Sequence, residues 1–336
     1  MNSLVIHLRY CTISVAKASN CTASRRYAAM NKADMIYDLS SLWAVTKEIF
    51  PYFDRLQLDW DEQYRICLEK LLVVDDEGDF HRLLTAFMES LQDGHSKYYP
   101  PAAYRKPKAY VPPEPPSFTV ADGVLTIRLN EFMKDHTPYV KHLLETTSGL
   151  SLVRLDIRSN IGGNTYYAAK VAELFISGTF ESCQKWTQAQ TAIATAGASQ
   201  LVCYSEEEIA RCIRDGMFTQ EAIADAKSTM NRTKYETYTS THGAEGQRAL
   251  YEGPLQLLIS RSTMSAAEDF TAMFKNTRRA TLIGQPTYGS TGTPCMIPLR
   301  CGGRAQVVSV GYRLPDGTEF IGKGILPDIE TDAASV

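Results

Sequence analysis

Strands and helices alternate along the second part of this 336-residue chain, and this order constrains the fold more than any other feature. Strands are expected where apolar and polar side chains alternate, and helices where apolar side chains recur near every 3.6 residues. The expected elements are a strand at 123–130, a helix at 136–147, a strand at 152–157, a helix at 166–176, a strand at 255–260, a helix through Phe274 and a strand at 280–284. Repeated strand–helix alternation predicts an α/β domain.

A separate helical unit is predicted ahead of this domain, at residues 34–99. Apolar side chains recur with helical spacing in three stretches, 36–50, 64–72 and 83–91. The unit ends in a tight turn, Gln92-Asp-Gly-His95. We therefore expect a small helical subdomain that presents this turn to the rest of the chain.

The helical unit and the α/β domain are separated by a linker at residues 100–122, because its first 17 residues contain seven prolines that disfavour ladder and helix bonding. The domain itself is expected at 123–336. It carries a polar, weakly periodic insertion near 180–250, with a helix at 205–215. In the tail, 305–325 predicts a β-hairpin that turns at Pro315-Asp-Gly317.

The N-terminal segment has no acidic residue before Asp34, although five basic residues lie there among many serines and threonines. This composition resembles an organellar transit peptide. A secretory leader fits less well, since the apolar stretch 4–15 is broken by polar and basic side chains, and translation from Met30 is a third interpretation. Residues 1–33 are thus taken as an acid-free leader or an unstructured extension.

The bulk properties exclude several classes of protein. The formal net charge is −3, with basic and acidic residues interspersed, so no nucleic-acid partner is expected and a neutral or peptide-like substrate fits better. No apolar run approaches the roughly 20 residues of a membrane-spanning helix, so no stable membrane insertion is expected. Eight cysteines without a CxxC pair read as mostly reduced core residues, and a structural zinc site is not expected. These features favour a soluble protein of the cytoplasm or an organelle over a secreted one, and none indicates an oligomeric state.

Ser265 is the first candidate for chemistry, in the segment Ser262-Thr-Met-Ser-Ala-Ala-Glu268. It follows an apolar strand and precedes a helix, where free backbone N–H groups stabilise developing negative charge. An acyl-transfer nucleophile suits this place. The ordinary alternative is a serine that caps the helix.

Two further signals are weaker by themselves. His95 lies in a glycine-containing turn, and an imidazole is the natural base for a hydroxyl nucleophile, although a loop histidine is more often solvated surface. Gly162 and Gly163 follow the strand at 152–157, where glycine lets a backbone N–H approach a ligand closely, as an oxyanion hole requires. A simple tight turn is the alternative for this pair.

Together these segments resemble the C-terminal-processing, or tail-specific, serine peptidases. The matching segments occur in the family's order and are Leu91-Gln-Asp-Gly-His-Ser96, Leu155-Asp-Ile-Arg-Ser-Asn-Ile-Gly-Gly163, Ser262-Thr-Met-Ser-Ala-Ala-Glu268, Gly284-Gln-Pro-Thr-Tyr-Gly289 and Gly322-Lys-Gly-Ile-Leu-Pro-Asp-Ile329. The resemblance implies a core of the crotonase and Clp-protease kind, built of β-β-α units. It also implies Ser265 as nucleophile and the Gly-Gly loop as a source of oxyanion donors.

The chain departs from the bacterial and chloroplast branch of this family. That branch resembles it up to Gly289, but uses a lysine base at the next position, which is Ser290 here, and its supporting glutamine falls at Pro294. A Ser-Lys dyad is thereby excluded. The tricorn-like branch instead uses a histidine that matches His95, and needs no PDZ domain, for which the linker has no room. Tricorn has a serine just before that histidine, whereas this chain has Gly94.

The resemblance implies that His95 removes the Ser265 proton and that backbone N–H groups of Gly162 or Gly163 and of Ala266 hold the oxyanion. A carboxylate that orients the base is also implied. The most direct match to that carboxylate's position is Ile321. Glu319, two residues earlier, is the candidate because a two-residue offset in a strand keeps the same face, with Asp328 as the alternative. No metal or organic cofactor is needed for such hydrolysis of a peptide or protein.

Two rival functions share the implied fold. One is a noncatalytic module that binds a hydrophobic ligand or a peptide, which also fits the missing lysine. The other is a crotonase-like acyl-CoA enzyme, although it would have no use for Ser265, and no basic cluster is prepared for a CoA phosphate.

Overall fold

The structure is a computed structural model that describes residues 30–105, 111–187, 205–216, 219–221, 223–224 and 236–331. Nearly all of the predicted leader and part of the predicted insertion lie outside these ranges, as do Cys11, Cys21 and Cys203. Helix α1 (Lys32–Ile49) begins just inside the range set aside as leader, and Met30 N donates a hydrogen bond to Glu77 Oε1 at 2.6 Å. The folded unit therefore includes residues 30–33.

A six-stranded sheet forms the centre of the molecule, in the order β12-β8-β7-β4-β3-β2. Its strands are β2 (Ser117–Ala121), β3 (Val124–Arg128), β4 (Leu152–Asp156), β7 (Leu255–Ile259), β8 (Thr281–Gly284) and β12 (Ile329–Glu330). Strands β2 and β3 are antiparallel, and every other neighbouring pair is parallel. Because parallel strands end at the same edge, the loops after β3, β4, β7 and β8 lie together at that edge.

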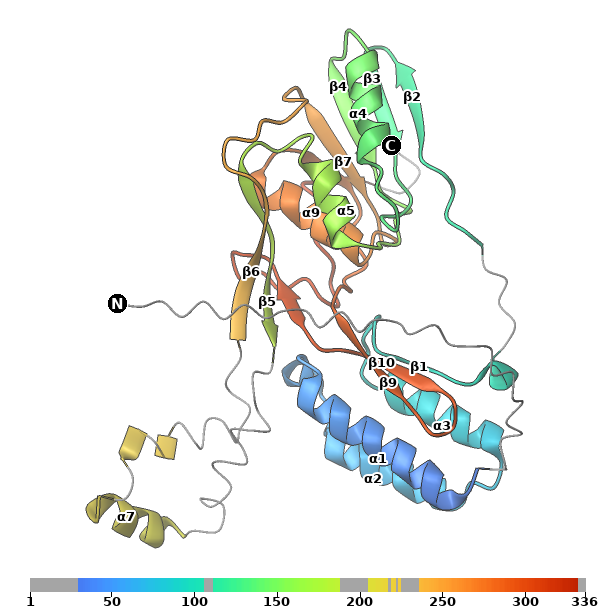
Figure 1. Ribbon diagram of the computed structural model, residues 1–336, viewed down its shortest axis with the longest axis vertical. Helices are drawn as coiled ribbons and strands as arrows, with labels where there is room; N and C mark the ends of the chain where they lie inside the picture. The colour runs from blue at the N-terminus through green and yellow to red at the C-terminus, as the bar shows by residue number, and fades with distance from the viewer. Residues whose placement is uncertain are drawn as a thin grey trace, which may run out of the picture.

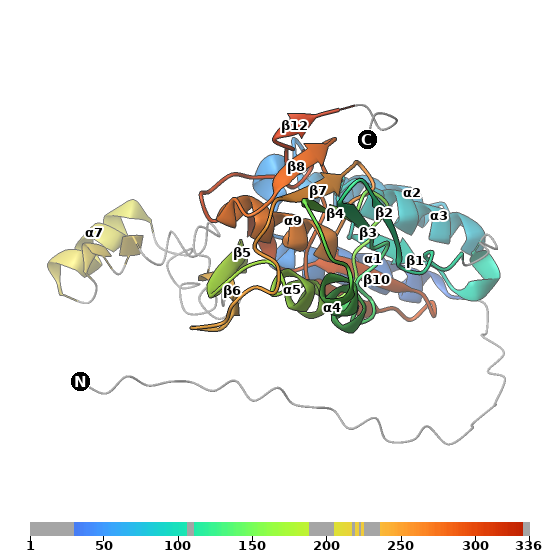
Figure 2. The ribbon, with the colours of Figure 1, turned by 90° about the horizontal axis from the view of Figure 1, so that it is seen from above.

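Three helices cover one face of this sheet: α4 (Thr137–Thr146), α5 (Thr165–Ala172) and α9 (Ala266–Thr277) (Figure 2). Leu125 and Ile127 of β3 are fully buried beneath them, as are Phe270 and Phe274 of α9. The predicted α/β core is confirmed. A buried apolar helix directly after β7 fixes where the β7–α9 loop, and Ser265 with it, must lie.

The predicted helices of the N-terminal unit are confirmed as α1, α2 (Trp60–Leu72) and α3 (Glu77–Glu89), followed by β1 (Lys97–Tyr99). Single-turn helices lie at Phe53–Arg55 and Ala102–Tyr104. Strand β1 pairs with β10 (Arg304–Val308), which pairs with β9 (Pro294–Pro298). The apolar faces of the helices pack on this small sheet, so the C-terminal strands complete the core of the N-terminal unit (Figure 1).

A third sheet has the order β11-β5-β6, made of β5 (Thr179–Thr187), β6 (Glu236–Gly243) and β11 (Gly311–Arg313). The predicted tail hairpin is wrong, because β10 pairs with β1 and β9 whereas β11 pairs with β5. The turn itself exists, and Leu314 N donates to Thr318 O at 2.9 Å across it. The predicted helix in the insertion is confirmed as α7 (Glu206–Arg214).

Among the cysteines whose side chains the structure describes, Cys67 and Cys183 are buried and Cys295 and Cys301 half-buried. All four are free thiols. None of the helices in the described ranges is both long enough and apolar enough to cross a membrane.

Candidate active site

Hydrogen bonds join three loops at the carboxyl edge of the central sheet. Met264 N, in the loop after β7, donates to Asn160 O in the loop after β4 at 3.1 Å. Tyr288 N, in the loop after β8, donates to Thr263 O at 2.9 Å. The loops that hold the candidate nucleophile and the Gly-Gly pair are therefore one bonded assembly.

Ser265 has a backbone conformation that side-chain-bearing residues rarely adopt, with φ 58° and ψ −130°. Such strain costs of order 1–3 kcal/mol and persists only where the surroundings enforce it. Here Ser265 N donates to Ser290 O at 3.0 Å and Glu268 N donates to Ser265 O at 2.7 Å. Ser265 occupies the N-cap position of α9, but its side chain makes no capping hydrogen bond. The ordinary interpretation, a capping serine, therefore does not account for this hydroxyl.

Gly162 and Gly163 lie against the nucleophile segment and against the loop after β3. A Cβ at Gly162, whose φ is +89°, would stand 2.5 Å from Ser265 Cβ and 2.9 Å from Ala266 N. At Gly163 it would meet the backbone of Phe132 at 2.4 Å. Gly162 N donates to Asn160 Oδ1 at 2.9 Å, so that N–H is already engaged. The structure thus brings Gly162 beside Ser265 and Ala266, at a distance that only glycine permits.

Replacing Gly162 with alanine should lower kcat at least about 100-fold, because the new methyl displaces both Ser265 and the Ala266 N–H that we propose below as an oxyanion donor. Gly178→Ala is the matched control, since Gly178 has φ +73° but a methyl group there would meet no atom within 4 Å. Both variants should lose about 1–2 kcal/mol of stability from the positive φ. Equal activities of the two variants, measured on one peptide substrate, would contradict this prediction.

His95 lies between α3 and β1, and the small sheet holds its backbone in place, since Gln306 Nε2 donates to His95 O at 2.8 Å. Its Nδ1 is 2.5 Å from Ser290 Oγ. Burial lowers the pKa of His95, whereas the nearby Asp93 carboxylate acts to raise it. Ser290 therefore touches both predicted catalytic residues, through its hydroxyl to His95 and through its carbonyl to Ser265.

The loop that carries Ser290 is bound to a buried carboxylate on α9. Glu268 accepts hydrogen bonds from Thr287 Oγ1 at 2.5 Å, from Gly289 N at 2.8 Å and from Ser290 N at 2.8 Å. Its side chain is fully buried, which raises its pKa to about 7 against the opposing effect of these three donors. One carboxyl group thus fixes the whole loop from residue 287 to 290.

Glu319, the predicted orienting acid, pairs with Arg55 rather than with the imidazole. Its Oε2 lies 3.0 Å from Arg55 Nε, in a cavity of about 500 Å³ that Gly94 and Ser290 also line. Residue 319 lies outside any strand, so the argument from strand faces does not apply to it. The structure places Glu319 next to the His95 turn but does not bond it to His95.

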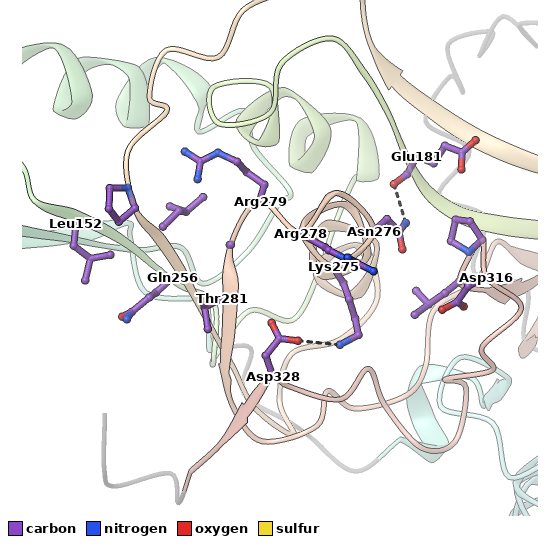
Figure 3. A pocket seen from close by; sticks show the side chains of 15 residues that line it. Leu152, Glu181, Gln256, Lys275, Asn276, Arg278, Arg279, Thr281, Asp316 and Asp328 are labelled. Atoms are coloured by element: carbon purple, nitrogen blue, oxygen red, sulfur yellow. Dashed lines mark hydrogen bonds and ion pairs between the residues drawn. The ribbon is translucent and has the colours of Figure 1, made fainter.

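Asp328, the alternative acid, lies elsewhere in the fold. It lines a larger cavity of about 900 Å³ at the amino ends of β4, β7 and β8, whereas Ser265 follows the carboxyl end of β7. Figure 3 shows its carboxylate turned toward Lys275, with Oδ1 3.3 Å from Lys275 Nζ. Its Oδ2 accepts from Leu282 N at 2.9 Å. These contacts tie the tail to the sheet and do not serve the candidate site.

Sequence reasoning missed two residues of this site. The sequence identifies Ser290 only as a position without the lysine base, whereas the structure places its hydroxyl against His95 Nδ1. The sequence indicates for Asp93 only a place in the turn, yet both of its carboxylate oxygens are shielded from solvent and no donor of the described residues bonds them. A buried, unbonded carboxylate two residues from a candidate base is a feature that needs an explanation.

Comparison with known proteins identifies the family of this chain. The family model described as peptidase family S41 matches residues 123–331, from β3 to the end of β12. The chain belongs to peptidase family S41. The region matched by the family model includes the Gly-Gly loop, Ser265 and Ser290, whereas His95 lies before this region in the sequence.

Curated relatives of this S41 chain align with it over limited regions. It is 36% identical over 78 residues to the carboxy-terminal-processing protease of Bartonella bacilliformis, which covers 23% of this chain and 18% of that protein. It is 27% identical over 207 residues to the chloroplastic carboxyl-terminal-processing peptidase 1 of Arabidopsis thaliana, covering 60% and 32%. The chain thus spans a third or less of the length of these relatives.

Solved structures match nearly the whole S41 chain. A putative peptidase from Parabacteroides merdae superposes with a TM-score of 0.62 at 17% identity, covering 90% of each chain. Mature CPAF superposes with a TM-score of 0.62 at 13% identity, covering 89% of this chain and 92% of that chain. At such identities the likeness concerns the fold, and both matches extend over the helical unit as well as the α/β core.

Proposed function

We propose that this S41 chain is a serine peptidase that hydrolyses peptide or protein substrates by acyl transfer through Ser265. One observation carries the proposal: Ser265 holds a strained backbone at the start of α9, its hydroxyl caps no helix, and the Gly162 backbone approaches it as closely as only glycine allows. This backbone conformation suits a nucleophile, and the Ser265 side chain does not cap α9. Family membership supports the same chemistry.

In the proposed mechanism, His95 Nε2 takes the Ser265 hydroxyl proton while Oγ attacks the substrate carbonyl carbon. The N–H groups of Gly163 and Ala266 donate to the oxyanion, since the Gly162 N–H is bonded to Asn160. His95 then gives the proton to the leaving amine. Water attacks the acyl-enzyme in the second half, with His95 again as base.

The predicted third member, Glu319, has no direct part in this proposal, because its carboxylate binds Arg55. We assign it to the wall of the cavity beside Gly94, where a bound substrate segment would meet it. The negative charge nearest to the base in chain order is Asp93, whose shielded carboxylate favours the imidazolium that forms during catalysis.

The finer fold assignment is also a proposal. We place the core in the crotonase and Clp-protease group, with β2, β3 and α4 forming one β-β-α unit. The division into residues 34–99, 100–122 and 123–336 is changed at three places: the helical unit begins at Met30, β2 of the linker range joins the central sheet, and β9 and β10 complete the sheet of the helical unit. For location, the cytoplasm or an organelle stays our proposal.

Labelling with a fluorophosphonate tests this function against the noncatalytic binding module. We expect the wild-type protein to be labelled, and mass spectrometry of the digest to place the label on the peptide that contains Ser265. An intact protein that hydrolyses no peptide or ester and takes up no label would favour the binding module instead. A label found on another serine would assign the nucleophile to that serine instead of Ser265.

A further inference from the structure

Ser290 occupies a distinctive place between the two proposed catalytic residues. Its hydroxyl lies 2.5 Å from His95 Nδ1, and its carbonyl accepts from Ser265 N at 3.0 Å. Its own N–H is bonded to Glu268. All three polar groups of this one residue are therefore used, two of them on the nucleophile and the base.

Burial separates the tasks of the two serines. Ser290 is only 2% exposed and its hydroxyl contacts His95 Nδ1, so it is less accessible to a substrate carbonyl than Ser265 is. Ser265 is half-buried, lies at the helix N-terminus and has the Gly162 backbone close beside it. Ser290 consequently acts on the base, and Ser265 on the substrate.

We propose that Ser290 is the positioning residue for His95, holding the imidazole with its Nε2 lone pair toward Ser265. This inference rests on the proposed function. In the arrangement we propose, His95 Nδ1–H donates to Ser290 Oγ, which leaves Nε2 unprotonated and able to accept the Ser265 proton. When Nε2 has taken that proton, the imidazolium keeps its Nδ1–H bond to Ser290. The proton then leaves from Nε2 to the amine product, so Ser290 gains and loses nothing.

The Ser290 hydroxyl can do this because the loop around it is fixed. Glu268 binds Thr287, Gly289 and Ser290 through one carboxyl group buried on α9, the helix that begins directly after Ser265. The positions of the nucleophile and of the group that orients the base are thereby set by the same helix. A neutral hydroxyl held this firmly can replace the carboxylate that usually orients a catalytic histidine.

Three variants test the inference. Ser290→Ala deletes the hydroxyl, and Ser290→Cys keeps its volume but accepts hydrogen bonds weakly. Thr291→Val is the matched control, because it removes the neighbouring buried hydroxyl, which bonds Asp269 rather than His95. We expect Ser290→Ala and Ser290→Cys to lower kcat about 10- to 100-fold with KM within about twofold, and Thr291→Val to stay near wild type.

A second readout does not depend on turnover. The ¹⁵N chemical shifts of His95, assigned by comparison with His95→Ala, should report the Nδ1–H tautomer in the wild type. In Ser290→Ala, this tautomer should lose its dominance. The pH at which His95 protonates should also fall, because the imidazolium loses an acceptor.

The outcomes separate the two proposals. Wild-type kcat and an unchanged His95 tautomer in Ser290→Ala would overturn the positioning role while leaving the peptidase intact. A Ser290→Cys variant that matches wild type would do the same, because packing alone would then account for Ser290. A wild type without hydrolysis or labelling would sink the proposed function, and the tautomer measurement would still decide what Ser290 does to His95.

Discussion

Replacing Ser265 with alanine is expected to lower kcat at least about 10⁴-fold, while the thermal unfolding temperature stays within a few degrees of wild type. The loss is large because the proposed mechanism has no other group that can form the acyl-enzyme. The fold should tolerate the change, since the Ser265 side chain makes no capping hydrogen bond that the helix would lose. Alanine also leaves both backbone bonds of residue 265 in place.

Ser262→Ala is the matched control for this experiment. Ser262 lies in the same loop, three residues earlier, and is exposed to solvent. Peptide hydrolysis and fluorophosphonate labelling should be lost in Ser265→Ala and unchanged in Ser262→Ala. Substantial turnover by a folded Ser265→Ala protein would reject the nucleophile and, with it, the proposed mechanism.

The order of elements was predictable from the sequence because it depends on local patterns. Alternation and helical spacing predict β3, β4, β7 and β8 and the helices that follow the first three, with α4, α5 and α9 as the result, and parallel strands then bring their carboxyl-end loops together. This rule places Gly162 and Ser265 at the same edge of the sheet, and the pairing of β4 with β7 brings their two loops together. The shared edge was therefore predictable from the sequence, whereas the contact itself depends on the strand order.

The partners of short strands were not predictable. Strands β10 and β11 lie next to each other in sequence and read as a hairpin, yet β10 completes the helical unit while β11 joins β5. Which strand a short strand pairs with depends on which apolar face remains uncovered. This is a property of the assembled core and not of the local sequence. The turn at residues 314–318 formed as predicted, but it lies after β11, and the next strand of the described residues, β12, pairs with β8.

The contact between His95 and Ser290 was not predictable either, because it also depends on how the structural units pack. His95 and Ser290 are 195 residues apart in sequence, in different structural units, and no spacing rule connects them. The family resemblance implies Glu319 as the carboxylate that orients the base. In the structure this carboxylate forms an ion pair with Arg55, 264 positions earlier in the chain. Side-chain partners at such separations are decided by packing between units.

Replacing His95 with alanine is expected to lower kcat/KM about 10⁴-fold, since general-base catalysis and protonation of the leaving amine are both lost. In the wild type, kcat/KM should rise with pH as the imidazolium deprotonates and then level off. Burial lowers the pKa of His95, so the neutral, active form should persist to lower pH than for an exposed histidine. His142→Ala, at an exposed position on α4, should leave both the rate and this pH profile unchanged.

The charges around His95 allow a sharper test of its role as the base, because they determine in which direction a substitution shifts the pH dependence of kcat/KM. Asp93 and Asp269 favour the imidazolium, whereas burial and Lys97 oppose it. Asp93→Asn removes the stronger of the two favourable charges, so the rising limb of kcat/KM should move to lower pH than in the wild type. The same change should lower the plateau, because the imidazolium in the transition state loses its stabilising carboxylate. A limb that moves to higher pH, or one that persists in His95→Ala, would show that another group is the base.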